Sequence, residues 1–320
     1  MSTTIKILLA VAAVLIVSGL ILFTFLMMSN EWDFSKLSTE KYETNTYDIV
    51  DSFENIQIDT DTANITFALS DDAKSKVVCY EREKVYHSVS VSNGTLFIKT
   101  VDKRKWYDFI QIDFRSPTIT VYLPYEELNS LSINEGTGDV KIPENFSFNN
   151  IDISASTGDV NCRASASEKL RIKLSTGNIL LENVTAGSLD LAVSTGKIEI
   201  SSIACEGDIS LKVSTGKSVM ENVSCKNLVS NGSTGDISLK NVIATEKFDI
   251  KRSTGDVRFV LCDAAEIYVR TGTGDVEGSF VSDKVVFATT DTGDVRIPHT
   301  TVGGRCEITT GTGNIIVTIS

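Results

Sequence analysis

Apolar and polar side chains alternate along the chain from about residue 50 to its end, and the alternation repeats with a fixed period. The dipeptide Thr-Gly marks this period, because its glycine recurs every 19 or 20 residues. When the ten units are aligned on that glycine, the seventh residue before it is always apolar. The fifth before, the second after and the fourth after are apolar in nine of the ten units. Period-two alternation predicts strands with one buried face, whereas a helix would need apolar residues three and four apart.

Each unit therefore predicts a strand of about seven residues, a corner at Thr-Gly, a shorter strand and a second corner. Two topologies fit this pattern, an antiparallel meander and a parallel β-solenoid. A constant repeat favours the solenoid, because like residues then stack on like in continuous ladders. We predict an all-β fold of about ten 19–20-residue coils, forming a rod of roughly 50 Å at the usual strand spacing. The corner glycines, expected to need positive φ, are Gly138, Gly158, Gly177, Gly196, Gly216, Gly235, Gly255, Gly274, Gly293 and Gly313.

The N-terminus differs, since residues 7–28 form an uncharged apolar run of 22 residues. As a helix this run would be about 33 Å long, which is enough to cross the hydrocarbon core of a membrane. It is longer than a signal-peptide core and lacks small residues at its end, so we predict an uncleaved signal anchor. Lys6 precedes the run, and Glu31 and Asp33 follow it. The positive-inside rule then places residues 1–6 in the cytoplasm and the remainder outside, as a single-pass protein of the cell membrane.

The sequence between the anchor and the first Thr-Gly unit divides into two further regions. Residues 29–50 are polar and rich in turn-forming residues, and we expect a juxtamembrane stalk. Residues 51–130 predict a membrane-proximal β region that caps the solenoid of residues 131–320, because terminal units of repeat arrays are atypical. Within this cap, residues 56–67 follow the repeat pattern as a degenerate coil. Asn93-Gly94 lies between two alternating runs and predicts a β-hairpin.

Repeated S-T-G-D-[IV] units behind a membrane anchor resemble the bacterial "putative adhesin" family of β-strand-repeat surface proteins, a domain of unknown function. The matching segments are STGDV at 156 and 253, STGDI at 233, TGTGDV at 271 and the strand TVYLP at 120–124. The resemblance covers about residues 50–320. It implies an extracytoplasmic β-solenoid in the cell envelope, often in its stress response, and it brings no catalytic residues.

Charge and composition exclude several functions. The chain has 42 acidic and 30 basic residues, a net charge of -12, which argues against nucleic-acid binding. It has only two histidines, His87 and His299, so a His-rich metal site or a Ser-His-Asp triad is improbable. Some parallel β-helices cleave polysaccharides in grooves built by long loops, but these coils are uniform. We therefore expect neither enzymatic activity nor a cofactor.

Aspartates follow several corner glycines and suggest one metal hypothesis. Asp236, Asp256, Asp275 and Asp294 lie on four units that are consecutive in sequence. Carboxylates stacked at the strand spacing repel one another, and Ca²⁺ between coils would relieve this repulsion. The alternative, which we favour, is that aspartate or asparagine accepts hydrogen bonds from corner backbone N–H groups.

Three other columns lead to further expectations. The threonine before each glycine has the parity of the buried positions, so we expect it to lean inward. The third residue before each glycine is apolar in only four units and includes Glu135 and Arg252, so we expect this column to be partly wet. Most of the six cysteines fit apolar columns as free thiols. Only Cys205 and Cys225 share a column on neighbouring coils, where a disulfide is the alternative.

Two segments suggest contact with partners. Residues 102–109, DKRKWYDF, predict a hairpin tip, with contact to anionic lipid headgroups as the alternative. The chain ends in a strand without a cap, so Ile315, Ile316 and Val317 are a candidate pairing edge for another copy or an envelope component.

We therefore predict a non-enzymatic, membrane-anchored module that acts as an adhesin-like binder or scaffold for an envelope protein or surface glycan. The alternatives are a regulatory component of an envelope-stress or antimicrobial-response system and, less favoured, a polysaccharide-active enzyme.

Overall fold

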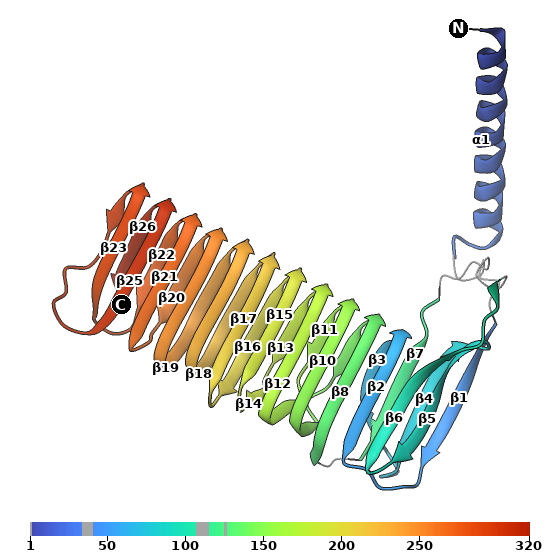
Figure 1. The fold of residues 1–320 in the computed structure, drawn as a ribbon, viewed down its shortest axis with the longest axis horizontal. Helices are drawn as coiled ribbons and strands as arrows, with labels where there is room; N and C mark the ends of the chain where they lie inside the picture. The colour runs from blue at the N-terminus through green and yellow to red at the C-terminus, as the bar shows by residue number, and fades with distance from the viewer. Residues whose placement is uncertain (1, 34–40, 107–114, 125–126) are drawn as a thin grey trace.

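The computed structural model describes residues 2–33, 41–106, 115–124 and 127–320 (Figure 1). Helix α1 (Thr3–Ser29) contains the whole apolar run, and the side chain of Ser2 accepts a hydrogen bond from the backbone N–H of Ile5 at 3.4 Å. Its mean hydropathy reaches 2.9 over 18 residues, and almost all of its side chains are exposed. The helix is therefore long and apolar enough to span a membrane.

The region next to the helix is a small two-layered β cap. Strand β4 (Ser75–Arg82) pairs antiparallel with β1 (Tyr42–Ile49) and with β7 (Thr118–Leu123). Strands β5 (Val85–Ser92) and β6 (Thr95–Asp102) form the predicted hairpin, with Asn93 and Gly94 at φ values of 50° and 71°. Residues 42–49, which fall within the range expected for the stalk, are thus a strand of the cap, because Tyr47 and Ile49 pack against its core.

A degenerate first coil joins the cap to the repeats, as the column pattern predicts. It consists of β2 (Asn55–Thr62) and β3 (Asn64–Leu69). Strand β2 pairs in parallel with β6 on one side and with β8 (Glu127–Thr137) on the other. The core therefore continues from the cap into the rod without interruption, as one cluster of buried residues.

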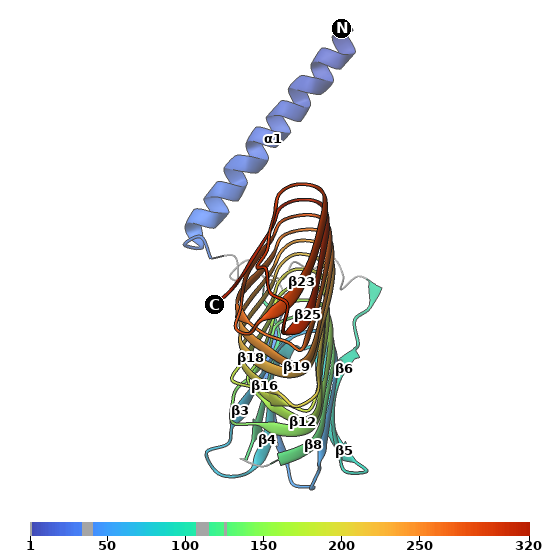
Figure 2. The ribbon, with the colours of Figure 1, turned by 90° about the vertical axis from the view of Figure 1, so that its left-hand side faces the viewer.

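The repeats form the predicted parallel β-solenoid, and the coils overlie one another in the view along the rod (Figure 2). Each threonine before a corner glycine is in register with its counterpart in the next coil, for example Thr195 with Thr215. The remaining strands are β9 (Val140–Ile142), β10 (Ser147–Thr157), β11 (Val160–Cys162), β12 (Ser165–Thr176), β13 (Ile179–Glu182), β14 (Thr185–Ala186), β15 (Leu189–Thr195), β16 (Ile198–Cys205), β17 (Asp208–Thr215), β18 (Ser218–Thr234), β19 (Ile237–Thr254), β20 (Val257–Cys262), β21 (Glu266–Thr273), β22 (Val276–Phe280), β23 (Lys284–Thr292), β24 (Val295–Arg296), β25 (Gly304–Thr312) and β26 (Ile315–Ile319).

The corner glycines allow close stacking of the coils. All ten have positive φ, from 123° to 156°. At Gly216, where φ is 136°, a Cβ atom would lie 1.7 Å from the carbonyl oxygen of Gly196 in the preceding coil. No side chain fits at that distance, so the corner requires glycine both for its backbone conformation and for space.

The order of the coils departs from the order of the sequence at the distal end. Strand β25 lies between β21 and β23, and β26 lies between β22 and β24. The last coil in the sequence is therefore inserted beneath the one before it. A physical reason is that its Ile308 is buried, whereas the equivalent residue of the outer coil is the smaller Ala288. Burying the larger side chain removes more apolar surface from water.

This insertion corrects the expected pairing edge. Ile315 pairs with Val276 on one side and Val295 on the other, and Ile316 is paired on both sides as well. Ile315 and Val317 are buried. The free end of the stack is therefore β23 with β24, one coil away from where the order of the sequence placed it.

Candidate functional site: a serine-lined groove along the rod

A groove runs along the rod over the first strands of successive coils. Its main part, of about 560 Å³, crosses from β8 to β18, and a second hollow of about 230 Å³ continues it to β21. The two parts share Lys212, Ser214 and Asn231. We call this feature the serine groove, because the serine of the repeated Ser-Thr-Gly motif lines it in six coils: Ser156, Ser175, Ser194, Ser214, Ser233 and Ser253.

The repeat explains how the groove forms. Residues two and four before each corner glycine point outward, and the residue between them points into the core. Serine is small, so the column next to the corner is low. The column four before the glycine carries longer side chains in most coils, although Ser154 and Ala192 are small, and these longer side chains form a wall. Four of these wall residues are the cations Lys173, Lys212, Lys251 and Arg270. The groove therefore offers hydroxyl groups on its floor and positive charge on its wall.

A buried polar cluster lies behind the distal part of the groove. Arg252 is 5% exposed, and its guanidinium donates to the hydroxyls of Ser230 at 2.9 Å and Ser218 at 3.5 Å. It also donates to the carbonyl oxygen of Lys251 at 3.0 Å. Burial lowers the pKa of Arg252 to about 10. Ser218 and Ser230, the exceptions in two apolar columns, are thus brought together with the buried Arg252 of a neighbouring coil.

The expectation that the third column before glycine is partly wet is wrong. Arg252 and Glu135 are both buried, at 5% and 3% exposure. Glu135 accepts a hydrogen bond from the backbone N–H of Ala63 at 3.1 Å, while its other carboxylate oxygen is buried without a partner among the described residues. Burial raises the pKa of Glu135 to about 8.

The corner aspartates do not form the stack of four that the sequence order suggested. Asn314 of the inserted coil lies between Asp275 and Asp294. The carboxylate of Asp236 accepts from the backbone N–H of Asp256 at 3.1 Å, and that of Asp256 accepts from Asp275 at 2.9 Å. The hydrogen bond from Asp256 is the main reason that the pKa of Asp236 is lowered. This geometry favours the backbone-capping role over Ca²⁺ binding.

The threonines before the glycines also differ from expectation, because they are exposed in every coil. The chain turns at the serine, so the alternation of the strand does not carry through to the threonine. The ladder register shows this, since it passes from Ala155 paired with Leu174 directly to Thr157 paired with Thr176. The corner therefore presents adjacent columns of serine and threonine hydroxyls to solvent.

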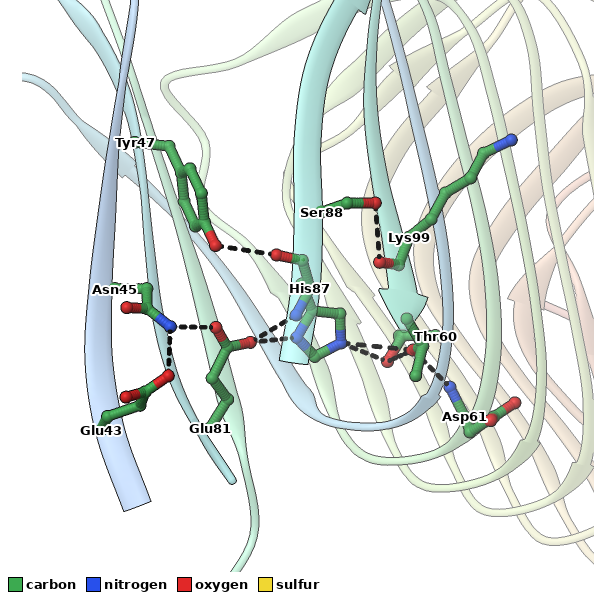
Figure 3. A network of polar contacts seen from close by, with 10 residues as sticks. Glu43, Asn45, Tyr47, Thr60, Asp61, Glu81, His87, Ser88 and Lys99 are labelled. Atoms are coloured by element: carbon green, nitrogen blue, oxygen red, sulfur yellow. Dashed lines mark hydrogen bonds and ion pairs between the residues drawn. The ribbon is translucent and has the colours of Figure 1, made fainter. Parts of the chain in front are cut away.

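The cap contains a second polar cluster, which the sequence did not reveal (Figure 3). Nδ1 of the buried His87 lies 2.7 Å from a carboxylate oxygen of Glu81, and its Nε2 lies 2.9 Å from the hydroxyl of Thr60. The backbone N–H of His87 donates to the same Glu81 oxygen at 2.7 Å, and Asn45 donates to the other at 2.7 Å. The only signal was Glu81 itself, a charged residue with the parity of the buried positions on β4.

The cluster around His87 has the composition of a metal site but is already satisfied. Cys79, Glu81 and His87 place one ligand atom each within 4.8 Å of one another. However, the Glu81 carboxylate accepts three hydrogen bonds, and burial raises the pKa of Cys79 to about 12, so its thiol is protonated. The order carboxylate, imidazole, hydroxyl also resembles a catalytic relay, yet Thr60 is only 6% exposed. We interpret the cluster as a buried network that joins the two layers of the cap.

The remaining sequence hypotheses concern cysteines and the basic segment of the cap. All six cysteines are buried free thiols, including Cys205 and Cys225. Burial is the main reason that the pKa of Cys225 is raised to about 12. In the segment 102–109, Arg104 forms an ion pair with Asp102 at 2.6 Å, and residues 107–109 lie outside the described residues.

Comparisons with known proteins identify the repeat region. The model of the Toastrack DUF4097 family matches residues 53–211 and 204–320. No curated protein matches the chain. A crystal structure of a putative lipid binding protein from Parabacteroides distasonis ATCC 8503 is 17% identical, with 88% of this chain and 98% of that chain covered and a TM-score of 0.49. A putative adhesin from Bacteroides fragilis NCTC 9343 is 18% identical, with 88% and 99% covered and a TM-score of 0.38. A putative adhesin from Parabacteroides merdae ATCC 43184 is 12% identical, with 87% and 97% covered and a TM-score of 0.40.

Proposed function

The chain belongs to the Toastrack DUF4097 family, and from that premise we propose that it is a non-enzymatic binding module that holds an extended surface glycan in the serine groove. Residues 7–28 anchor it in the cell membrane, and the rod lies outside the cytoplasm. Support for the anchor comes from the length and hydropathy of α1, and support for the orientation comes from Lys6 before it and the acidic residues after it.

The serine groove is the observation on which this proposal depends. It runs in one direction across successive coils, so it suits an extended polymer better than a compact small molecule. Successive coils are separated by about 4.8 Å, the strand spacing, which is close to the length of one sugar ring in an extended chain. Each coil therefore presents a similar set of hydroxyl groups to each successive sugar.

The chemistry of the groove also fits a glycan. Its floor carries serine hydroxyls, which both donate and accept hydrogen bonds, and Asn134 and Asn231 add side-chain amides. Sugars present hydroxyl groups along both edges of the chain, so donors and acceptors match without one fixed orientation. Because the floor repeats, such binding strengthens with the length of the ligand.

A groove-blocking substitution tests the proposal. The full chain in detergent micelles is passed over immobilised envelope polysaccharides. Binding is compared for Ser194→Trp, in the groove, and Ser224→Trp, an exposed serine that follows the second corner of its coil at Asn222 and does not line the groove. We expect Ser194→Trp to reduce binding at least tenfold and Ser224→Trp to leave it within twofold of the unmodified chain. Equal binding by both variants, or no binding to any polysaccharide, would overturn the proposal.

A further inference from the structure

We infer that the distal part of the serine groove, between Lys212 and Arg270, is an oxyanion site that selects glycans carrying sulfate, phosphate or carboxylate groups. This inference rests on the proposed glycan-binding function and narrows its ligand to an anionic polysaccharide. Four of the ten residues that line this hollow are cationic, namely Lys212, Lys251, Arg252 and Arg270, and none of the ten is acidic.

The cations come from neighbouring coils by direct strand pairing. Lys212 pairs with Asn231, Asn231 pairs with Lys251, and Lys251 pairs with Arg270. Like charges directly opposite each other on adjacent strands destabilise a sheet. The arrangement at Lys251 and Arg270 is therefore unfavourable for the empty rod and becomes favourable when an anion lies between the side chains.

Most of this positive charge lacks a partner within the protein. Across the described ranges, neither Lys212 nor Arg270 forms an ion pair, and Lys251 forms one with Asp249 at 3.1 Å. Cations elsewhere on the rod are commonly paired, for example Lys240 with Glu221 and Lys226 with Glu246. On a chain with a net charge of -12, an unpaired cationic strip is a local exception.

Arg252 adds the most specific observation. Its guanidinium is buried, and its acceptors are two serine hydroxyls and a backbone carbonyl, all of them neutral. Burying a charge without an opposite charge is costly. An oxyanion in the hollow outside it would offset this cost, because the positive potential of Arg252 adds to that of the three cations at the rim.

The sequence is altered in several coils to accommodate Arg252. Gly232 lies beside it, and a Cβ atom there would lie 2.7 Å from one guanidinium nitrogen. Ser218 and Ser230 occupy positions that are apolar in the other nine units. Three departures from the repeat thus converge on one buried cation, which an apolar core would not need.

The anion site is tested with dextran sulfate and with uncharged dextran of the same length. The full chain in detergent micelles is titrated with each polymer at 50 and 300 mM NaCl. The double variant Lys212→Ala/Arg270→Ala is compared with the control Lys226→Ala/Lys240→Ala, whose lysines are also exposed. We expect dextran sulfate to bind to the unmodified chain and to the control within twofold of each other, and at least tenfold more weakly to the groove variant. We also expect weaker binding at 300 mM NaCl.

Two results would overturn the anion site. One is no binding of dextran sulfate at 50 mM NaCl, and the other is equal binding by the two double variants. These results are distinguishable from failure of the proposed function. If the groove variant retains binding to an uncharged polysaccharide that Ser194→Trp abolishes, the groove binds glycans without selecting anions. If Ser194→Trp changes binding of no polysaccharide, both proposals fail.

Discussion

Replacement of one corner glycine should destabilise the rod far more than replacement of a glycine in an open turn. In Gly216→Ala the new Cβ atom would lie 1.7 Å from the carbonyl oxygen of Gly196, whereas a relaxed contact is about 3.5 Å. The two coils must therefore separate locally by nearly 2 Å. Gly94→Ala is the matched control, because Gly94 also has positive φ, at 71°, but a Cβ atom there meets nothing within 4 Å.

The magnitude follows from the hydrogen bonds that this separation would break. The backbone N–H of Gly196 donates to Thr215 at 3.0 Å, and that of Ile198 donates to Lys217 at 3.0 Å. Leaving such groups unsatisfied costs about 1–3 kcal/mol each. The backbone conformation at Gly216, with φ of 136°, adds about 1–3 kcal/mol for alanine. We expect a loss on the order of 4 kcal/mol in the free energy of unfolding for Gly216→Ala, and about 1 kcal/mol for Gly94→Ala.

The measurement is urea unfolding of the full chain in detergent micelles, followed by the strand signal in far-ultraviolet circular dichroism. Coils of a solenoid contact only their neighbours, so a break at Gly216 should also split the transition in two. The reasoning would be refuted if both variants lost the same free energy, because the contact between coils would then contribute nothing beyond backbone preference.

Three further predictions concern single positions. The folded-state pKa of Glu135, about 8, lies above the ordinary value of 4.5, so its contribution to stability is complete below pH 4.5 and is lost as the pH rises through 8. Glu135→Gln should therefore flatten the fall in urea midpoint between pH 5 and 9, and an unchanged slope would contradict this. Leu261 has φ of 51° at the corner position that Asn241 occupies one coil earlier, and asparagine tolerates positive φ better than leucine does. Leu261→Asn should therefore raise the free energy of unfolding by about 1 kcal/mol in the same assay. A loss of stability would count against this prediction. If rods associate through the free edge, Val295→Lys should lower the sedimentation coefficient of the full chain. Val260, on β20, is similarly exposed but lies away from that edge, so Val260→Lys should leave the sedimentation coefficient unchanged. Equal sedimentation coefficients for the two variants would argue against this interface.

The fold was predictable because the repeat is a short, local sequence pattern that occurs in ten units. Period-two alternation and a glycine every 19 or 20 residues determine strand, corner and stacking together. The order of the last two coils was not predictable, because either order places the same columns in contact. It depends on small differences, such as Ile308 against Ala288, that matter only when one coil covers the other.

The groove and the polar clusters were predictable only in part. The columns that line the serine groove are visible in the sequence as polar positions, but their depth depends on where the chain turns at each corner. The cluster at His87 joins residues from β2, β4 and β5, which no local pattern relates. Ser218, Ser230 and Arg252 are each visible as an exception to the repeat, and only the stacking of three coils shows that they form one cluster.

The exceptions to the repeat are the best guide to function in a protein of this kind. Residues that keep the pattern are explained by packing, since any apolar side chain of similar size would serve. Packing does not explain a buried arginine, because replacing a buried charge with well-packed apolar residues is often neutral or stabilising. The rod nevertheless contains Arg252, a glycine beside it and two serines beneath it, next to three surface cations of which two have no acidic partner in the part of the chain that the structure describes. Packing does not require this combination, whereas the proposed binding of a negatively charged ligand in the groove accounts for it.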